Sequence, residues 1–254
     1  AEVRYQEGVK ELRQGSGESA RAAYYHFDRA DDLVPGYKDT EDKLLEALEK
    51  GTIRVLVEQI PVPSRRYQLS GKFFQNQVDE YLSSYSRNMF VRFYTELDRN
   101  QPRNPDQIIQ LRFEDFAVGQ THLYEKEQTV TSTDSVEVGT VTLEDGTKQP
   151  VYGLVSAQLT TFKKQVLSGG VLGMLITDGQ TGRIIADERF PGEFDWFCEW
   201  ATFNGDERAL TPDQRRLCGV STLPPPPPQD LFVEFTRPIY NQVTARLNRI
   251  YKNF

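Results

Sequence analysis

The sequence predicts an α+β protein, with an N-terminal helical hairpin and a mixed, mostly antiparallel sheet covered by helices. Residues 1–50 repeat small and apolar side chains every three or four positions, as one face of a helix does. From residue 51 the pattern changes to short alternating segments separated by turn signals, which is typical of strands. Residues 230–253 return to helical spacing, and helices combined with an antiparallel sheet in this way make an α+β layer architecture.

The first fifty residues contain signals for three helices. A Gly-Ser-Gly turn at residues 15–17 separates the first two, Pro-Gly at residues 35–36 ends the second, and Asp39 is placed to cap a third that ends at Gly51. This order, with the segment YYHFDRADDLVPGY, resembles a tetratricopeptide (TPR) repeat followed by the opening helix of a second. One repeat of roughly 34 residues is too little for a solenoid. We therefore expect residues 1–50 to be a TPR-like module that packs on the next domain.

Three segments after this module have the alternation of half-buried strands: residues 53–58, 90–96 and 107–119. A helix is predicted between the first two segments. Its apolar face contains Phe74, Val78, Tyr81 and Leu82.

Two hairpins are predicted further along the chain. Asp145-Gly146 is a strong turn signal, and the sequence DGQTG at residues 178–182 forms the loop of a second hairpin. Between residues 129 and 138 the side chains are polar on both sides of the expected strand. This stretch is therefore expected to be a ribbon in water rather than a strand that crosses a core.

We interpret residues 191–229 as a loop insertion. Within it, Thr211 as the N-cap and Pro212 as the first helical residue predict a short helix that Gly219 ends. Five prolines at residues 224–228 predict a polyproline II spacer, and recruitment of an aromatic-groove domain is the alternative.

The closing segment predicts a helix packed across the sheet. Pro238 is acceptable in such a helix only near its first turn, because proline lacks the backbone N–H group. The apolar face comprises Phe232, Phe235, Ile239, Val243, Leu247 and Ile250.

The order of these elements resembles a known family. At residues 53–61, in VYGLVSAQLTTF (151–162) and in LITDGQTGRII (175–185), the chain is similar to the periplasmic domain of the curli-secretion (CsgG-type) outer-membrane lipoprotein family. The resemblance covers roughly residues 51–254 and makes them one α+β domain. It implies an exported protein, periplasmic or associated with the outer membrane, whose only contact with the membrane is an N-terminal lipid anchor outside this chain.

The best-known members of that family secrete amyloid subunits through an oligomeric pore, and this chain departs from them. A membrane-crossing hairpin needs an apolar side chain at every second position, and residues 129–138 provide no such face. We therefore expect an assembly, secretion-associated or scaffold component that acts through protein contacts. The partner's identity and homo-oligomer formation stay open.

The composition excludes some partner classes. The net charge of −7 and the isoelectric point near 5.1 argue against nucleic acid or an anionic membrane surface, which require clustered lysine and arginine. No stretch reaches the roughly 18 consecutive apolar residues of a membrane-spanning helix.

Common catalytic motifs are absent from the sequence. The chain has neither the phosphate-binding G-x-x-x-x-G-K-[ST] loop nor a G-x-S-x-G nucleophile elbow. His26 and His122 have no second histidine at ligand spacing, so we interpret both as structural residues. We expect no catalytic residue, no metal and no cofactor, and hence a protein that is not an enzyme.

Two alternatives stay open. The first is a glycan-active hydrolase, in which two carboxylates beside Trp196 and Trp200 cleave a glycosidic bond. The second is a small-ligand binding module, for which a deep apolar pocket is expected. The acidic residues in question are Asp187, Glu188, Glu193, Asp195, Glu199, Asp206 and Glu207.

Aromatic side chains predict the interaction surface. Tyr24 and Tyr25 of the helical module, and Trp196 and Trp200 of the insertion, are the candidates for contact with a partner.

The two cysteines allow two interpretations. Cys198 and Cys218 lie twenty positions apart, and a disulfide closing that loop would contribute about 3 kcal/mol. Two buried thiols are the alternative.

Overall fold

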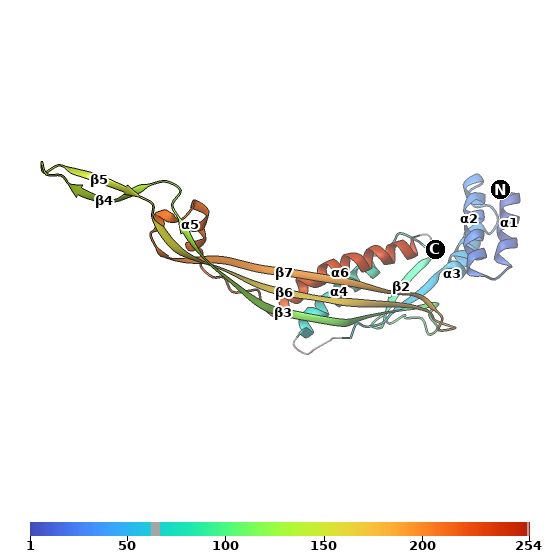
Figure 1. The fold of residues 1–254 in the computed structure, drawn as a ribbon. Coiled ribbons are helices and arrows are strands. Elements are labelled where there is room, and N and C mark those ends of the chain that lie inside the picture. Colours follow the sequence, from blue (N-terminus) through green and yellow to red (C-terminus); the bar gives the residue numbers. More distant parts are fainter. Residues whose placement is uncertain (62–66, 253) are drawn as a thin grey trace. The chain divides into compact units, whose positions relative to one another are not determined.

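The computed structural model describes residues 1–61, 67–252 and 254, and the fold is α+β, as predicted (Figure 1). The chain divides into two compact units. The first comprises residues 1–116, 169–192 and 232–254, and the second comprises residues 117–168 and 193–231. Three long strands contribute residues to both units. The helical module belongs to the first unit together with part of the sheet, and the domain boundary at residue 50 stays a prediction.

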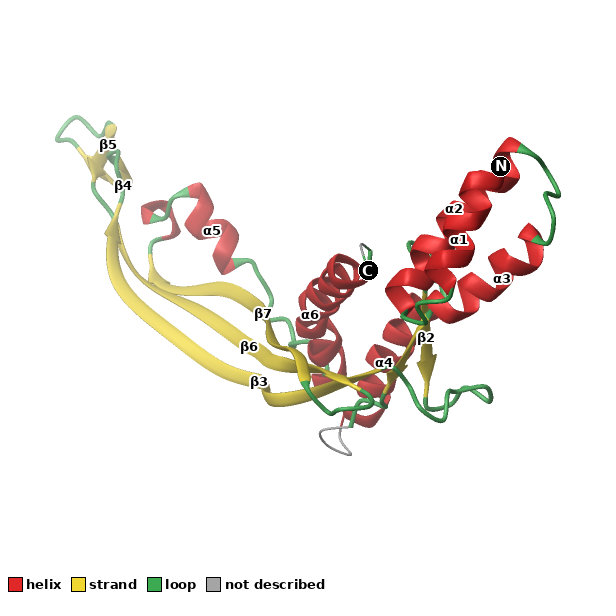
Figure 2. Ribbon diagram, turned by 90° about the vertical axis from the view of Figure 1, so that its right-hand side faces the viewer, coloured by secondary structure: helices red, strands yellow, loops and turns green. Residues whose placement is uncertain are grey.

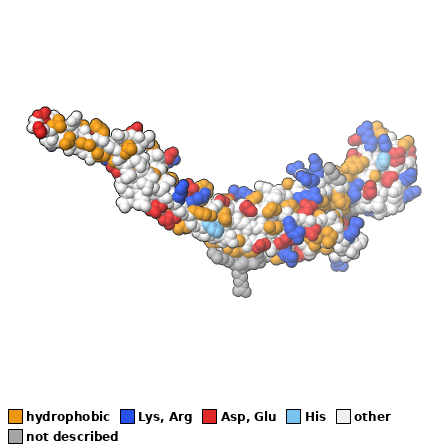
Figure 3. Space-filling model, viewed as in Figure 1, with side chains coloured by type: hydrophobic (Ala, Val, Ile, Leu, Met, Phe, Trp, Pro, Cys, Tyr) orange, Lys and Arg blue, Asp and Glu red, His pale blue; other side chains and the backbone are white. Residues whose placement is uncertain are grey.

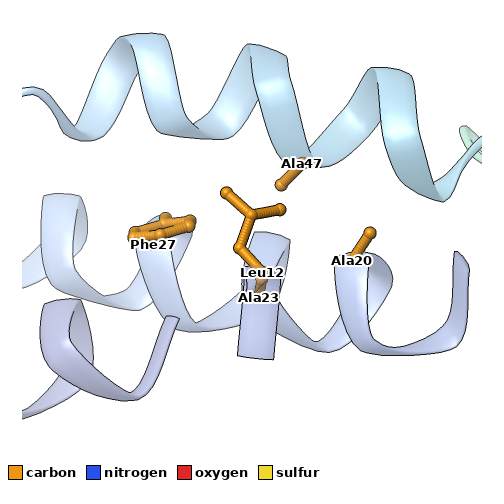
Figure 4. Packing of buried hydrophobic residues seen from close by; sticks show 5 residues of the cluster. All are labelled: Leu12, Ala20, Ala23, Phe27 and Ala47. Carbon is orange, nitrogen blue, oxygen red and sulfur yellow. The ribbon is translucent and has the colours of Figure 1, made fainter. Parts of the chain in front are cut away.

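Three helices begin the first unit, at the positions predicted for them: α1 (Glu2–Leu12), α2 (Gly17–Leu33) and α3 (Thr40–Gly51). A small cluster of buried side chains joins them (Figure 4). Gly8 belongs to this contact, because a Cβ atom there would lie 2.7 Å from the ring of Phe27. The cluster consists of Leu12, Ala20, Ala23, Phe27 and Ala47.

The N-caps of α2 and α3 differ. Ser16 caps α2 with a reciprocal pair of hydrogen bonds to Ser19. Asp39 is the N-cap residue of α3, but its carboxylate makes no cap hydrogen bond and accepts one from the hydroxyl of Tyr5 instead. Asp39 has φ −100° and ψ 31°, outside the extended region in which a side chain reaches back to the helix N-terminus, so its predicted capping role is wrong.

The main sheet has the strand order β2-β1-β3-β6-β7 (Figure 2). It is mixed, as predicted, but β1 runs parallel to both of its neighbours, β2 and β3. A parallel pair needs a crossover connection, and α4 (Gln68–Ser83) lies in the one between β1 and β2. The strands are β1 (Ile53–Val57), β2 (Val91–Thr95), β3 (Gln107–Thr131), β6 (Ser156–Asp178) and β7 (Ile184–Gly205).

Helices α4 and α6 (Pro228–Tyr251) pack on one face of the first unit's strands. Phe113 of β3 contacts Phe74 of α4 and Phe232 of α6, with ring centroids 5.5 Å apart in both pairs. The hydroxyl of Tyr81 donates a hydrogen bond of 3.0 Å to the carbonyl of Thr244, which joins the two helices. The predicted apolar face of α4 is confirmed, because Phe74, Val78 and Leu82 are buried.

Pro238 does not lie in the first turn of the closing helix, where the sequence predicted it. Helix α6 begins at Pro228, so Pro238 is an interior residue. The helix continues past Pro238 because side chains before and after it in the sequence are fully buried. They are Phe232, Phe235, Ile239 and Val243. Burial of these side chains outweighs the lost backbone hydrogen bond.

The second unit contains the outer parts of β3, β6 and β7, together with the hairpin of β4 (Val136–Thr142) and β5 (Lys148–Gly153). The hairpin turn is where Asp145-Gly146 predicted it, since Gly146 has φ 82° and the Leu143 N–H donates to the carbonyl of Thr147. The short helix α5 (Pro212–Cys218) has the predicted cap at Thr211, and the 3-10 helix η2 (Glu207–Ala209) precedes it.

The interpretation of residues 191–229 as a loop insertion is wrong for its first part. Strand β7 continues to Gly205, so the tryptophans and most of the acids lie on a strand. The alternation was hidden because bulky aromatic residues occur at both odd and even positions, as at Trp196 and Phe197. At the other end of this stretch, the last residue of the proline run, Pro228, is already the first residue of α6.

Candidate binding surfaces of the second unit

The β4–β5 hairpin has one apolar face that nothing in its unit covers. Residues paired across the two strands share a face, so Val136 lies on the side of Gly153, and Val141 on the side of Gln149. The register shifts between Glu137 and Gly139, which makes Val138 a bulge residue. The resulting apolar face comprises Val136, Val138, Val141, Leu143 and Val151, of which the last four are 43–48% exposed.

The bulge is what brings these side chains together. In a regular strand Val136 and Val138 would face one side, and Val141 and Leu143 the other. One extra residue shifts the alternation by one position, so that Val138 lies on the side of Gly153. A Cβ atom added at position 153 would be 3.5 Å from the Val138 side chain. Figure 3 shows hydrophobic side chains gathered along the hairpin. Simple alternation misses this surface.

The opposite face of the hairpin is mainly polar. It presents Glu137, Thr140, Thr142 and Lys148, together with Pro150 and, near the hairpin base, Tyr152. The acidic residues Glu144 and Asp145 lie at the turn. The hairpin is thus amphipathic, with its apolar side open.

A second surface lies around Trp200 on β7. The indole stacks on the ring of Phe162 on β6, with ring centroids 5.3 Å apart and the ring planes 12° from parallel. Trp200 also borders two hollows. One has a volume of about 500 Å³ and lies next to residues 222–224, and the other, of about 270 Å³, extends toward Leu217 of α5.

The other three residues of the predicted interaction surface lie in two different units. Trp196 is half-buried on β7 of the second unit. Tyr24 and Tyr25 belong to the first unit, where both contact the ring of Phe90, with centroids 5.4 and 5.9 Å away. Tyr24 is half-buried and Tyr25 is 61% exposed. A role in partner binding stays a prediction for all four aromatic residues.

The acids of the hydrolase alternative are not arranged around one cleft. Glu188 accepts hydrogen bonds from Arg246 in the first unit, at 2.7 and 2.9 Å. Asp195 accepts one from Gln165, at 2.6 Å. Strand alternation directs Asp195 and Glu193 away from the face of Trp196 and Trp200.

Two further acids have cationic partners. Glu199, which borders the smaller hollow with Trp200, lies 3.6 Å from the ammonium group of Lys163. Hydrogen bonds from Arg208 lower the pKa of Asp206 to about 2. A general acid for glycoside cleavage needs a raised pKa. The geometry therefore does not favour this alternative.

The first unit has a hollow of its own on the open face of the sheet. It has a volume of about 430 Å³, and Glu58, Arg112, Asp187 and Arg189 are among its lining residues. This charged lining differs from the deep apolar pocket that the small-ligand alternative requires.

Across this hollow, Glu114 of β3 accepts a hydrogen bond of 2.7 Å from Arg189 of β7. Gly173 of the intervening strand β6 leaves room for this contact, since a Cβ atom there would lie 2.6 Å from the Glu114 carboxylate.

The histidines lie apart from any cluster of ligands. His26 lies on α2, where its Nδ1 is 3.4 Å from the carboxylate of Glu7, and His122 lies on β3 beside the ring of Tyr124. Within residues 1–61, 67–252 and 254, no three His, Cys, Asp or Glu side chains come together as a metal site. No helix in the same part of the chain has the length and apolarity needed to cross a bilayer.

Both cysteines are free thiols in the structure. Cys198 is buried on β7, and Cys218, at the end of α5, is half-buried. Burial raises the pKa of the Cys218 thiol, with a smaller contribution from the charge of Glu207. The structure therefore corresponds to the two-thiol interpretation, and the disulfide stays a prediction.

Comparison with known proteins gives several distant structural similarities, two of which follow. No protein-family model matches the chain, and no curated protein matches it. A neuraminyllactose-binding hemagglutinin homolog from Helicobacter pylori is 10% identical, with a TM-score of 0.36, over 80% of this chain and 91% of that one. A minor lipoprotein from Acinetobacter baumannii is 9% identical, with a TM-score of 0.21, over 76% of this chain and 92% of that one. Scores at this level establish neither a shared fold nor a shared function, and the chain is assigned to no family.

Proposed function

We propose that the protein is a non-enzymatic component of the bacterial cell envelope, periplasmic or associated with the outer membrane, that acts as an assembly or scaffold component through protein–protein contacts. Its main contact surface in this proposal is the apolar face of the β4–β5 hairpin. The partner is a protein that presents an apolar surface to this face.

One observation carries the proposal: the hairpin holds four large apolar side chains that are 43–48% exposed on the same face. A two-stranded hairpin is marginally stable by itself in water, and a third strand or a packed layer normally stabilises it. Contiguous exposed apolar surface with a polar margin marks a site of interaction. A partner that covers this face would bury the four side chains and stabilise the hairpin.

The charge of the hairpin favours a protein partner over a lipid surface. Glu137, Glu144 and Asp145 outnumber Lys148 on its strands and turn. Anionic headgroups attract clusters of lysine and arginine and repel acidic segments. A protein surface has no such requirement, because an apolar patch at the centre of an interface can carry a charged rim of either sign.

The proposed location has a different basis. It rests on the resemblance of residues 53–61, 151–162 and 175–185 to the curli-secretion lipoprotein family. The hairpin face itself is independent of that resemblance, so location and contact surface are tested separately.

The test replaces two valines of the apolar face by threonine. Val141→Thr and Val151→Thr together nearly conserve volume and keep a high strand propensity, so the hairpin should still form. The tagged protein, expressed in its native host, is crosslinked in place and recovered from envelope fractions. We expect the double variant to recover the partner at least about tenfold less than the wild type, because binding loses apolar burial at the centre of the contact.

A matched control changes the polar face of the same strand. Thr140→Ser with Thr142→Ser should recover the partner at the wild-type level. Equal recovery with both double variants would exclude the apolar face as the contact surface, and recovery of the protein from the cytosol alone would exclude the envelope. Size-exclusion chromatography with light scattering of the purified protein shows whether the partner is a second copy.

A further inference from the structure

The larger hollow beside Trp200 has the size and lining of a small-molecule site. Its volume of about 500 Å³ lies within the range of about 300–1,000 Å³ typical of ligand pockets. Strands β3, β6 and β7 form one wall, and residues 222–224 form another. The lining consists of Thr121, Leu123, Lys164, Trp200, Thr222, Leu223 and Pro224.

We propose that this hollow binds a small, elongated anion with an apolar body, such as a medium-chain alkyl carboxylate, and that Lys164 pairs with its negative group. The site goes beyond the contact surface of the hairpin and does not depend on the proposed function. It belongs entirely to the second unit.

The apolar part of the lining requires an apolar ligand body. Leu123 and Leu223 are each 61% exposed, so both present most of their side chains to water around the hollow. Burying such surface under a ligand is favourable, at about 25 cal/mol for each Å² removed from water. Trp200 adds a large flat apolar surface whose position is held by stacking on Phe162.

The charge of the lining selects the sign of the ligand. Lys164 is the one charged residue among the seven that line the hollow. No ion pair of Lys164 forms within the part of the chain that the structure describes, whereas its neighbour Lys163 lies 3.6 Å from the carboxylate of Glu199. Lys163 also stands over the ring of Phe197, 4.7 Å from its centroid, on the other face of the sheet. An anion in the hollow would give Lys164 the partner that Lys163 already has.

The polar groups of the lining complete the recognition. Thr222 brings a hydroxyl that can donate a hydrogen bond to a carboxylate, whereas the Thr121 hydroxyl donates one of 3.3 Å to the carbonyl of Gly119. A few polar groups at the edge of an apolar pocket orient the ligand. Pro224 begins the proline run that stiffens the wall, so less conformational freedom is lost on binding.

Isothermal titration calorimetry with decanoate, below its micelle concentration, tests the site. The intact wild-type chain is compared with Lys164→Gln and with Lys163→Gln. The two variants lose the same charge at adjacent positions on opposite faces, and only Lys164 lines the hollow. We expect Lys164→Gln to weaken decanoate binding about tenfold, because a charge-assisted contact is lost, and Lys163→Gln to change it less than about twofold.

Two ligand series separate the charge from the apolar body. Decanol and decyltrimethylammonium should bind more weakly than decanoate to the wild type, and Lys164→Gln should not weaken decanol binding. Affinity should rise about fourfold for each methylene added from hexanoate to decanoate while the chain still fits the hollow. Circular dichroism confirms that each variant is folded.

Several outcomes would overturn the assignment. They are the absence of saturable decanoate binding, an equal loss with the two lysine variants, and decanol binding as tight as decanoate. The Val141→Thr, Val151→Thr double variant should bind decanoate like the wild type, so this site and the hairpin contact can fail independently.

Discussion

At the scale of single residues, Gly173 of β6 allows two charged side chains to meet on the open face of the sheet. Glu114 and Arg189 lie on β3 and β7, and β6 runs between these strands. The two side chains meet because Gly173 has no Cβ atom to separate them. The charged lining of that hollow therefore depends on a residue that carries no charge.

Asp206 shows how a single partner sets an ionisation state. Hydrogen bonds from Arg208 lower its pKa from the ordinary value of 3.8 to about 2, and the Arg208 backbone N–H contributes as well. We predict that Arg208→Met raises the pKa of Asp206 to between 2 and 3.8, since the backbone hydrogen bond remains. A titration of the carboxyl carbon shift by NMR measures the change.

The sign of the effect on stability follows from the direction of this shift. A carboxyl group whose pKa is lower in the folded protein stabilises the fold above its unfolded pKa, near 3.8, and loses this contribution as the pH falls through about 2. Wild type should therefore be more stable than Arg208→Met at pH 7, and the difference should shrink in acid. Arg216→Met, which removes the partner of Asp213, is the control and should leave the Asp206 titration unchanged. An unchanged titration in Arg208→Met would contradict the prediction.

At the scale of elements, one inserted residue changes the character of the hairpin. The bulge at Val138 puts valines from even and odd positions of β4 on one face. Without it, the strand would present mixed faces, as the alternation of the sequence indicates. The amphipathic nature of the hairpin is thus a property of its register as well as of its composition.

The interior proline of α6 gives a prediction about stability. Pro238 supplies no N–H for the helix ladder, and a proline ring inside a helix generally clashes with the carbonyl four residues earlier, which here belongs to Glu234. We predict that Pro238→Ala increases the free energy of unfolding by about 1–3 kcal/mol. Chemical denaturation followed by circular dichroism measures it.

Pro212 is the control for this substitution, because it occupies the N-terminal end of α5, where proline is favoured. Pro212→Ala should leave stability unchanged or lower it slightly. A loss of stability in Pro238→Ala would show instead that the packing of the proline ring matters more than the missing hydrogen bond.

At the scale of the whole molecule, burial is distributed unevenly along the chain. Leu172, Met174 and Ile176 of β6 are at most 1% exposed, whereas the hairpin strands are exposed at nearly every position. Local stability follows buried contacts, and segments with few of them open most easily. The hairpin is accordingly the least stabilised part of the sheet structure.

Hydrogen exchange followed by mass spectrometry checks this distribution. In the free protein we predict that amides of residues 136–153 exchange at least about a hundredfold faster than those of residues 172–176. Binding of a partner at the apolar face should slow the hairpin amides and leave the others unchanged. If the hairpin amides of the isolated monomer were as protected as those of β6, the hairpin would not be an uncovered element.

Several elements were predictable from the sequence because their signals are local. The turns at residues 15–17, 145–146 and 178–182 and the N-cap at Thr211 each depend on a few neighbouring residues. The proposed ligand site was harder to predict from the sequence. The sequence indicates Trp200 as a surface residue, but it does not indicate that Leu123, Lys164 and Leu223 line a hollow beside it, since these residues are far apart in the chain.

The sequence by itself determined the fold class, most helix and strand positions and the absence of local catalytic motifs, because periodicity and turn chemistry act between near neighbours. Only the tertiary structure decided the parallel pairing of β1, the extension of β7 to Gly205, the helix that continues through Pro238 and the two surfaces proposed for binding. Each of these depends on which distant segments pack together, and burial against such segments outweighs the local preferences of the residues involved.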